Sequence, residues 1–161
     1  PFELRTTADL AYNTLVQYGA PAVDYPDVIT SVRDVGRANA PFGFADDTLK
    51  LRHTLAESTV TVEDTVLTPR VISSPRALTE NANYMGNCTA GYEHHIRDNE
   101  SLIIALDDKT TPQGATVYNV EIQRGESGRW DTIGEINSRF NNGVTEAEQR
   151  AIETRVAELL Q

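Results

Sequence analysis

The chain of 161 residues has a single cysteine, Cys88, so no disulfide can form within it. It also lacks an apolar run near the roughly 18 residues that a membrane-spanning helix needs. The longest such run, residues 102–106, has the length of a strand. No signal peptide is visible at its start. These absences predict a protein of a reducing compartment that makes no contact with a membrane.

Basic residues are also few, since 14 Lys and Arg stand against 24 Asp and Glu, which gives a formal net charge of −10. No basic block stands out anywhere along the chain. Nonspecific binding of nucleic acid depends on Lys and Arg that neutralise phosphates, so we expect none. The acidity is explained by solubility alone, or it favours a partner with a basic surface.

Patterns for metals and phosphates are likewise missing. Adjacent residues His94 and His95 point to different sides of a helix, and no CxxC or HExxH spacing accompanies them. Gly125 and Gly128 fit a hairpin connection better than a phosphate-binding loop. The sequence therefore predicts neither a metal site nor a cofactor.

Composition and periodicity indicate one globular domain, with 39% apolar and 24% charged residues. In the N-terminal part, residues 1–75, the spacing of apolar residues predicts a helix over 6–18 and a second helix between Pro26 and Gly36. Residues 48–57 fit either a strand or a helix, and residues 59–72 are typical of extended chain.

The second part, residues 76–161, has clearer patterns. Ser74 is expected to cap a helix over about 75–84, Asn87 to cap another over about 88–97, and Thr145 with Glu148 forms a capping-box pattern for a C-terminal helix. Strands are predicted at 102–106, about 116–122 and about 129–137. We expect an α+β fold in a single domain, with the helices packed on one face of a small antiparallel sheet.

Some finer expectations concern the strands. Continuous apolar residues predict that 102–106 is buried on both faces, whereas the alternation over 116–122 predicts a half-buried strand. The pair Asp107 and Asp108 is read as the beginning of a turn. In the third strand, Trp130, Thr132 and Ile136 are expected on one face.

The segment 85–96 is the densest cluster of unusual residues. On a helix, Cys88, Tyr92 and Ile96 fall on one face at positions i, i+4 and i+8. Cysteine is often buried, so these residues form the packed face of the helix. Alternatively, a thiol at a helix N-terminus has a lowered pKa, which would make Cys88 a nucleophile. His95 lies roughly 10 Å further along the helix, so a direct Cys88–His95 hydrogen bond is not expected.

The remaining candidates are polar residues near these elements. The catalytic candidates are Cys88 and His95. The binding candidates are Tyr92 and His94, together with three residues at and beyond the end of the last predicted strand, Asn137, Arg139 and Asn142.

A family resemblance adds to this interpretation. The approach LTENANYMGNC at 78–88, the spacing of Cys88, Tyr92 and Ile96, and the closing segment IGEINSRFNN resemble the PcfJ-like family, which is associated with phages, conjugative plasmids and other mobile elements. Unlike many members, this chain has Asn87 and Thr89 beside the cysteine. The resemblance spans about residues 76–142 and implies an accessory protein in the cytoplasm of a bacterial host.

Three hypotheses follow. The first is a phage or mobile-element accessory protein that binds a host or element-encoded protein or nucleoprotein. The second is a Cys88-dependent transferase or hydrolase that acts on a nucleotide or a peptide. The third is an acidic mimic of DNA that inhibits a nucleic-acid-binding protein.

Overall fold

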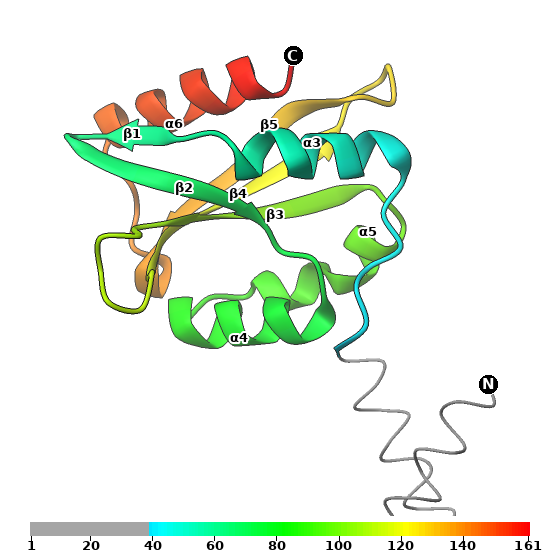
Figure 1. Ribbon diagram of the computed structural model, residues 1–161, viewed down its shortest axis with the longest axis horizontal. Helices are drawn as coiled ribbons and strands as arrows, with labels where there is room; N and C mark the ends of the chain where they lie inside the picture. The colour runs from blue at the N-terminus through cyan, green and yellow to red at the C-terminus, as the bar shows by residue number, and fades with distance from the viewer. Residues whose placement is uncertain (1–38) are drawn as a thin grey trace, which may run out of the picture. The chain divides into compact units, whose positions relative to one another are not determined.

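Residues 39–161, which the computed structural model describes, contain four α-helices and a five-stranded antiparallel sheet (Figure 1). The elements in chain order are α3 (Asp46–Ala56), β1 (Val60–Val62), β2 (Thr65–Val71), α4 (Pro75–Met85), η1 (Thr89–Tyr92), α5 (Glu93–Arg97), β3 (Ser101–Asp107), β4 (Thr116–Arg124), β5 (Trp130–Ser138), η2 (Arg139–Asn141) and α6 (Glu146–Leu159). The helices predicted at 6–18 and between Pro26 and Gly36 lie outside the described residues.

The strand order in the sheet follows the chain, β1-β2-β3-β4-β5, and every neighbouring pair is antiparallel. The α+β class predicted from the sequence is confirmed. The three predicted strands form β3, β4 and β5, and the extended region 59–72 supplies β1 and β2. The ambiguous segment 48–57 is helical as far as residue 56, within α3, and Glu57 is the C-cap of that helix. No helix within residues 39–161 has the length and apolar character to cross a bilayer.

Helices cover both faces of the sheet, rather than the single face expected from the sequence. The side chain of Tyr118 donates a hydrogen bond to Glu148 of α6, whereas that of its neighbour Asn119 bonds to Asn81 of α4. Successive side chains of a strand point to opposite faces, so α6 and α4 lie on opposite sides. Figure 1 shows α3 with α6 on one side and α4 with α5 on the other. The sheet is curled, and α6 contacts both edge strands, β1 and β5.

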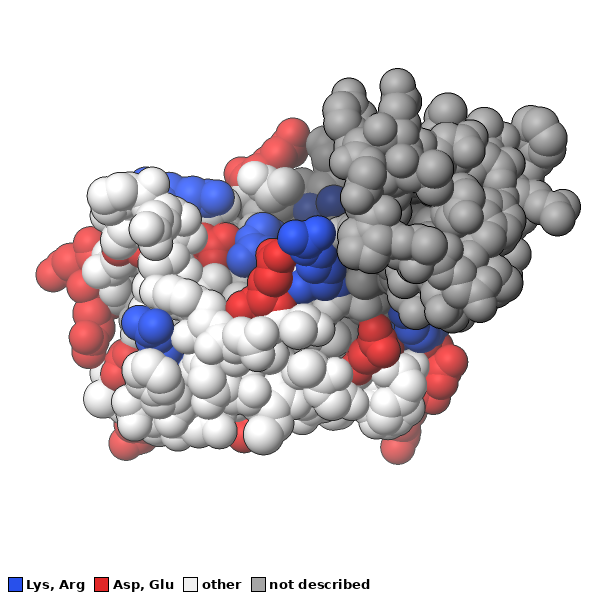
Figure 2. All heavy atoms as spheres, turned by 90° about the horizontal axis from the view of Figure 1, so that it is seen from below, with Lys and Arg blue, Asp and Glu red and all other residues white. Residues whose placement is uncertain are grey.

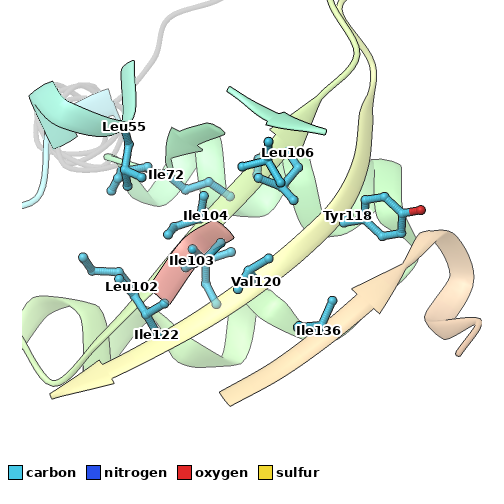
Figure 3. Close-up of a cluster of buried hydrophobic side chains, with 14 of the residues drawn as sticks. Leu55, Ile72, Leu102, Ile103, Ile104, Leu106, Tyr118, Val120, Ile122 and Ile136 are labelled. Atoms are coloured by element: carbon cyan, nitrogen blue, oxygen red, sulfur yellow. The ribbon is translucent and has the colours of Figure 1, made fainter. Parts of the chain in front are cut away.

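The α3–α6 side of the sheet is the apolar side. Strand β3 is buried along its whole length, as predicted. Cross-strand pairing places Leu102 opposite Ile122, Ile104 opposite Val120 and Leu106 opposite Tyr118. These side chains form one cluster with aliphatic residues of the helices and of β5 (Figure 3). Complete burial of such a side chain contributes about 1.5–3 kcal/mol, so this cluster is the main stabilising core.

Strand β4 differs from the expected half-buried strand, because Asn119 and Glu121 are buried as well as the apolar residues. Their face of the sheet is covered by α4 and η1, which the sequence pattern alone did not place there. In β5, an irregularity in the register opposite Val120–Ile122 changes the alternation. As a result Ile133 packs against the core and Thr132 is exposed, contrary to the prediction.

Asp107 is the last residue of β3 and not the beginning of a turn. Its side chain is 2% exposed, and its carboxylate forms an ion pair with the Arg70 guanidinium at 2.8 Å. Asp108 does begin the turn: its side chain accepts hydrogen bonds from the backbone and hydroxyl of Thr110, and these bonds lower the pKa of the Asp108 carboxyl.

The helix predicted over 88–97 is interrupted. A 3₁₀ turn, η1, precedes the short α5, and Cys88 is exposed before both. Thr89 and Gly91 are poor helix formers, and the Asn87 side chain accepts two hydrogen bonds from Thr89, which stabilise a turn. The expected packed face is therefore wrong for Cys88: Ile96 is buried, but Tyr92 is only half-buried.

Both predicted caps of the longer helices are confirmed. Ser74 accepts a hydrogen bond from the backbone of Ala77 at the start of α4. At the start of α6, Thr145 accepts from the Glu148 amide and Glu148 accepts from the Thr145 amide. The Glu148 carboxylate also accepts from the Tyr118 hydroxyl. The hydrogen bond from Tyr118, followed by those from Thr145, lowers the pKa of the Glu148 carboxyl.

Replacement Thr145→Ala is expected to lower the free energy of unfolding by about 1 kcal/mol, because it leaves the Glu148 amide without its cap. Chemical denaturation followed by circular dichroism measures this difference. The matched control is Thr145→Ser, which keeps the hydroxyl and should remain within about 0.5 kcal/mol of wild type. Equal destabilisation by both variants would argue against the cap.

Candidate functional site

Seven side chains form a continuous chain of hydrogen bonds beneath α4, which we name the polar chain. Its members are Thr89, Asn87, Asn119, Asn81, Thr116, Asp107 and Arg70. The donor–acceptor distances are 2.7 to 3.2 Å. Within the described residues, no buried side-chain N or O atom lacks a hydrogen-bond partner. The polar chain links α4 and the loop that follows it to strands β2, β3 and β4.

From Thr89 to Asp107, the hydrogen bonds of the polar chain all run in one direction, and Arg70 donates to Asp107 from the opposite end. Thr89 donates to Asn87, Asn87 to Asn119, and Asn119 to Asn81. Asn81 then donates to Thr116, and Thr116 donates to the Asp107 carboxylate. Aligned hydrogen bonds polarise one another, and a low local dielectric strengthens them. The negative charge of Asp107 is therefore met by Arg70 on one side and by this row of dipoles on the other.

The loop after α4 presents Cys88 to solvent. Gly86 ends the helix in a left-handed conformation, with φ of 62°, and Asn87 is held by Asn119. A methyl group at Gly86 would lie 2.6 Å from a ring carbon of Phe140, so η2 and this turn fit closely only because residue 86 is glycine. No residue within 39–161 forms a hydrogen bond with the Cys88 thiol.

Three side chains at the C-terminal end of α4 form what we name the aromatic platform: Tyr84, Arg139 and Phe140. The Arg139 guanidinium lies over the Tyr84 ring at 4.2 Å and over the Phe140 ring at 4.8 Å, measured to the ring centres. Its Nε donates to the Tyr84 carbonyl at 2.9 Å. The Tyr84 side chain is 37% exposed and that of Phe140 is 63% exposed. The face of the protein seen in Figure 2 has a broad area without charged residues.

A separate hollow of about 400 Å³ lies beside η1 and α5, lined by Tyr92, His95, Glu100 and Glu121 among others. His95 Nδ1 lies 2.9 Å from a Glu100 carboxylate oxygen. Burial raises the pKa of the Tyr92 phenol, and so do its hydrogen bond to Glu121 and the charges of Glu121 and Glu135. Tyr92 is thus held in its neutral, hydrogen-donating form.

The structure places the predicted site residues at several separate positions and not in one site. Tyr92 and His95 line the hollow, and the His94 ring lies 3.9 Å from that of His95, measured between ring centres, while remaining exposed. Cys88 lies in the loop at the end of the polar chain. Asn137 is half-buried on β5, opposite Asn119.

The last two predicted residues are associated with η2. Arg139 belongs to the aromatic platform. Asn142 closes the turn through its backbone, because its carbonyl accepts hydrogen bonds from the Ser138 hydroxyl and amide.

Sequence reasoning missed Asn81, Asn119, Glu121 and Phe140. The sequence did contain a signal for Asn119 and Glu121, since they are two residues apart in a predicted strand and therefore share one face of the sheet. Gly134, inside β5, was a second signal, because glycine within a strand often marks a close approach. The position of α4 decides whether that face is buried, and it could not be predicted from the sequence of the strand.

The described residues hold no group of three or more His, Cys, Asp or Glu that could bind a metal ion. Comparison of the chain with protein-family models, with curated proteins and with solved structures finds no match in any of the three. The geometry of these surfaces and the sequence resemblance of residues 76–142 are therefore the two indications of what the protein does.

The replacement Asn119→Ala should lower the free energy of unfolding by about 2–4 kcal/mol, because it removes the donor to the Asn81 side-chain oxygen and the acceptor of the Asn87 side-chain NH₂ group. The measurement is the midpoint and slope of urea unfolding. The control is Asn137→Ala on the adjacent strand, which lies outside the polar chain and should cost less than half as much. A loss below about 1 kcal/mol for Asn119→Ala would contradict the role assigned to the polar chain.

Cys88 is expected to react with a thiol reagent such as dithionitrobenzoate in the native protein, at a rate near that of the chain unfolded in urea. The reason is that the side chain is exposed. The Cys88→Ser variant, which should give no signal, is the control. Reaction only after unfolding would contradict the exposed position, and a native rate far above the unfolded rate would favour the nucleophile hypothesis.

Proposed function

We propose that this chain is an accessory domain of a phage or another mobile element that binds a protein or nucleoprotein partner with a basic surface. The resemblance of residues 76–142 to the PcfJ-like family supports the setting. The formal net charge of −10 supports a positively charged surface on the partner, because complementary charge speeds association and suppresses wrong partners.

The aromatic platform is the observation that carries this proposal. Tyr and Arg are the residue types most enriched, with Trp, among interface residues that dominate binding energy, and Phe is enriched in interfaces as well. Here the three side chains are stacked together at the surface, and the Arg139 side chain is fixed by its bond to the Tyr84 carbonyl. A fixed side chain loses little conformational entropy when a partner binds.

The backbone of Phe140 gives a second reason. Its φ of 61° and ψ of 32° lie in the left-handed region, as does the φ of 54° at Asn141. For a residue such as Phe this conformation costs about 1–2 kcal/mol. The cost brings the ring onto Gly86 yet leaves it 63% exposed, so intramolecular burial is a poor explanation for it. An exposed and rigid aromatic ring is what a partner-binding surface requires.

The exposed position of Cys88 favours a second candidate function, a transferase or hydrolase that uses this thiol on a nucleotide or a peptide. His95, the other catalytic candidate, is paired with Glu100 at the hollow. This function would require a substrate to bring a base to the thiol, since no described residue is hydrogen-bonded to it. Partner binding needs no such addition and is the better supported function.

The test compares baits that differ only at the surface. Tagged full-length wild type, Arg139→Ala, Phe140→Ala and Val66→Ala are used to retain proteins from a bacterial host lysate, and retained proteins are quantified by mass spectrometry. Val66 is the matched control, because it is an exposed apolar side chain, at 53%, on β2. Thermal unfolding of each variant checks that it is folded.

We expect wild type and Val66→Ala to retain one basic protein or nucleoprotein. Its recovery should fall at least about fivefold with Arg139→Ala and with Phe140→Ala, because truncation of an interface residue that dominates binding costs more than about 1 kcal/mol of binding free energy. Recovery should also fall as salt is raised. Equal recovery by all four baits, or none above background with wild type, would count against the proposal.

A further inference from the structure

Glu121 is a buried carboxylate without a counter-charge. Its side chain lies in the middle of β4, and the residue is 7% exposed. Gln123 donates a hydrogen bond to it at 2.6 Å and the Tyr92 phenol is hydrogen-bonded to it as well, but no Lys, Arg or His within residues 39–161 forms an ion pair with it. Buried charges in proteins are normally paired, because the loss of hydration is costly. A carboxylate in this position therefore lacks a cation.

The hollow beside Glu121 is open to solvent on one side and has space for such a group, at about 400 Å³. Arg124 also lines it, but the Arg124 donors are already engaged. They bond to the Asp47 carboxylate and to the carbonyls of Asn99 and Gly128, and the guanidinium stacks on Trp130 at 4.2 Å. This pairing lowers the pKa of the Asp47 carboxyl. Glu121 is the carboxylate of the hollow that no described basic side chain meets, whereas the Glu100 carboxylate is hydrogen-bonded to His95.

Gly134 leaves room for the Glu121 carboxylate beside β5. A methyl group at this position of β5 would lie 2.9 Å from Glu121 Oε2 and 3.0 Å from its carboxyl carbon. The absence of a side chain at Gly134 lets the Glu121 carboxylate approach the backbone of β5 closely. The need to leave room for Glu121 thus explains why a glycine occupies the middle of this strand.

The hollow is chemically suited to an organic cation. A metal ion is disfavoured, since the described residues include no cluster of three or more of its usual ligands. The Tyr92 and His95 rings, with centres 6.3 Å apart and planes inclined by 53°, form an aromatic wall beside the two carboxylates. Cations are attracted to the faces of aromatic rings, and a guanidinium also forms paired hydrogen bonds to carboxylates.

We propose that the hollow formed by Tyr92, His95, Glu100 and Glu121 binds the guanidinium group of an arginine side chain from the protein partner. This assignment rests on the proposed function, and it names the residue type by which a basic surface is recognised. Glu121 supplies the buried charge, Glu100 the charge at the rim, and Tyr92 one side of the slot.

The test uses a small probe, so that it does not depend on the identity of the partner. N-acetyl-arginine amide is titrated into the full-length ¹⁵N-labelled protein, and the backbone amides of Tyr92, Glu121 and Gly134 are followed by NMR. N-acetyl-citrulline amide is the matched control, because it has nearly the same shape without the charge. We expect saturable shifts with the arginine probe and at least about tenfold weaker binding of the citrulline probe.

Glu121→Gln should weaken binding of the arginine probe about tenfold or more, while the shape of the hollow stays unchanged. Glu100→Gln, at an exposed rim position, should weaken it about two- to fivefold and serves as the deciding variant if Glu121→Gln does not fold. Equal binding of the two probes, tighter binding of N-acetyl-lysine amide, or unchanged binding in the deciding variant would overturn the assignment.

Failure of this inference is distinguishable from failure of the proposed function. Phe140→Ala leaves the hollow intact and should bind the arginine probe as wild type does. If the arginine probe does not bind but a partner is still retained through the aromatic platform, only the assignment of the hollow is overturned.

Discussion

Asn119 donates a hydrogen bond from the middle of the sheet to Asn81 of α4, and it accepts one from Asn87 in the loop that follows. These two bonds are the centre of the polar chain, and the arrangement of that side of the protein depends on them. The apolar side of the sheet needs only aliphatic residues of suitable volume, and many combinations of such residues would pack there. The polar side allows far fewer solutions, because each buried amide must find its particular partner. The position of α4 is set by this requirement.

The consequences extend to both candidate surfaces. With α4 held on β3 and β4, Gly86 turns the chain toward η1, and Phe140 packs on that turn. The aromatic platform thus lies at one end of the polar chain. The next elements along the chain, η1 and α5, place Tyr92 and His95 beside Glu121, which forms the hollow. A rigid, fully bonded interior beneath two accessible surfaces is the usual way to fix binding residues without burying them.

Much of the fold could be predicted from local patterns. The capping residues of α4 and α6, the buried strand β3 and the hairpin between β4 and β5 were all expressed in short stretches of sequence, and each was confirmed. The second face of the sheet could not be predicted, because nothing in β4 itself says that α4 will bury Asn119. The interruption of the 88–97 helix had a local cause, Asn87 bonding to Thr89, but that bond also needed Asn119 to hold Asn87 in place.

The candidate site shows the same division. Tyr92, His95 and Arg139 were proposed from their residue types, and each lies at one of the two surfaces. Glu121, which lines the hollow with Tyr92 and His95, comes from a distant strand, and no spacing in the sequence joins it to them. Phe140 is next to Arg139 in the chain, but only the tertiary structure brings both of them to Tyr84. Phe140 also depends on a left-handed backbone that no propensity would suggest for phenylalanine. Contacts of this kind are set by tertiary structure and become visible only there.

The exchange of the side-chain amide protons of Asn81 and Asn119 with solvent, followed by NMR in the native protein, tests the polar chain most directly. Both amides should give separate, shifted resonances that exchange far more slowly than those of the exposed Asn142, because opening them requires α4 to leave the sheet. Exchange of Asn81 and Asn119 as fast as that of Asn142 would mean that the polar chain does not hold α4 in place.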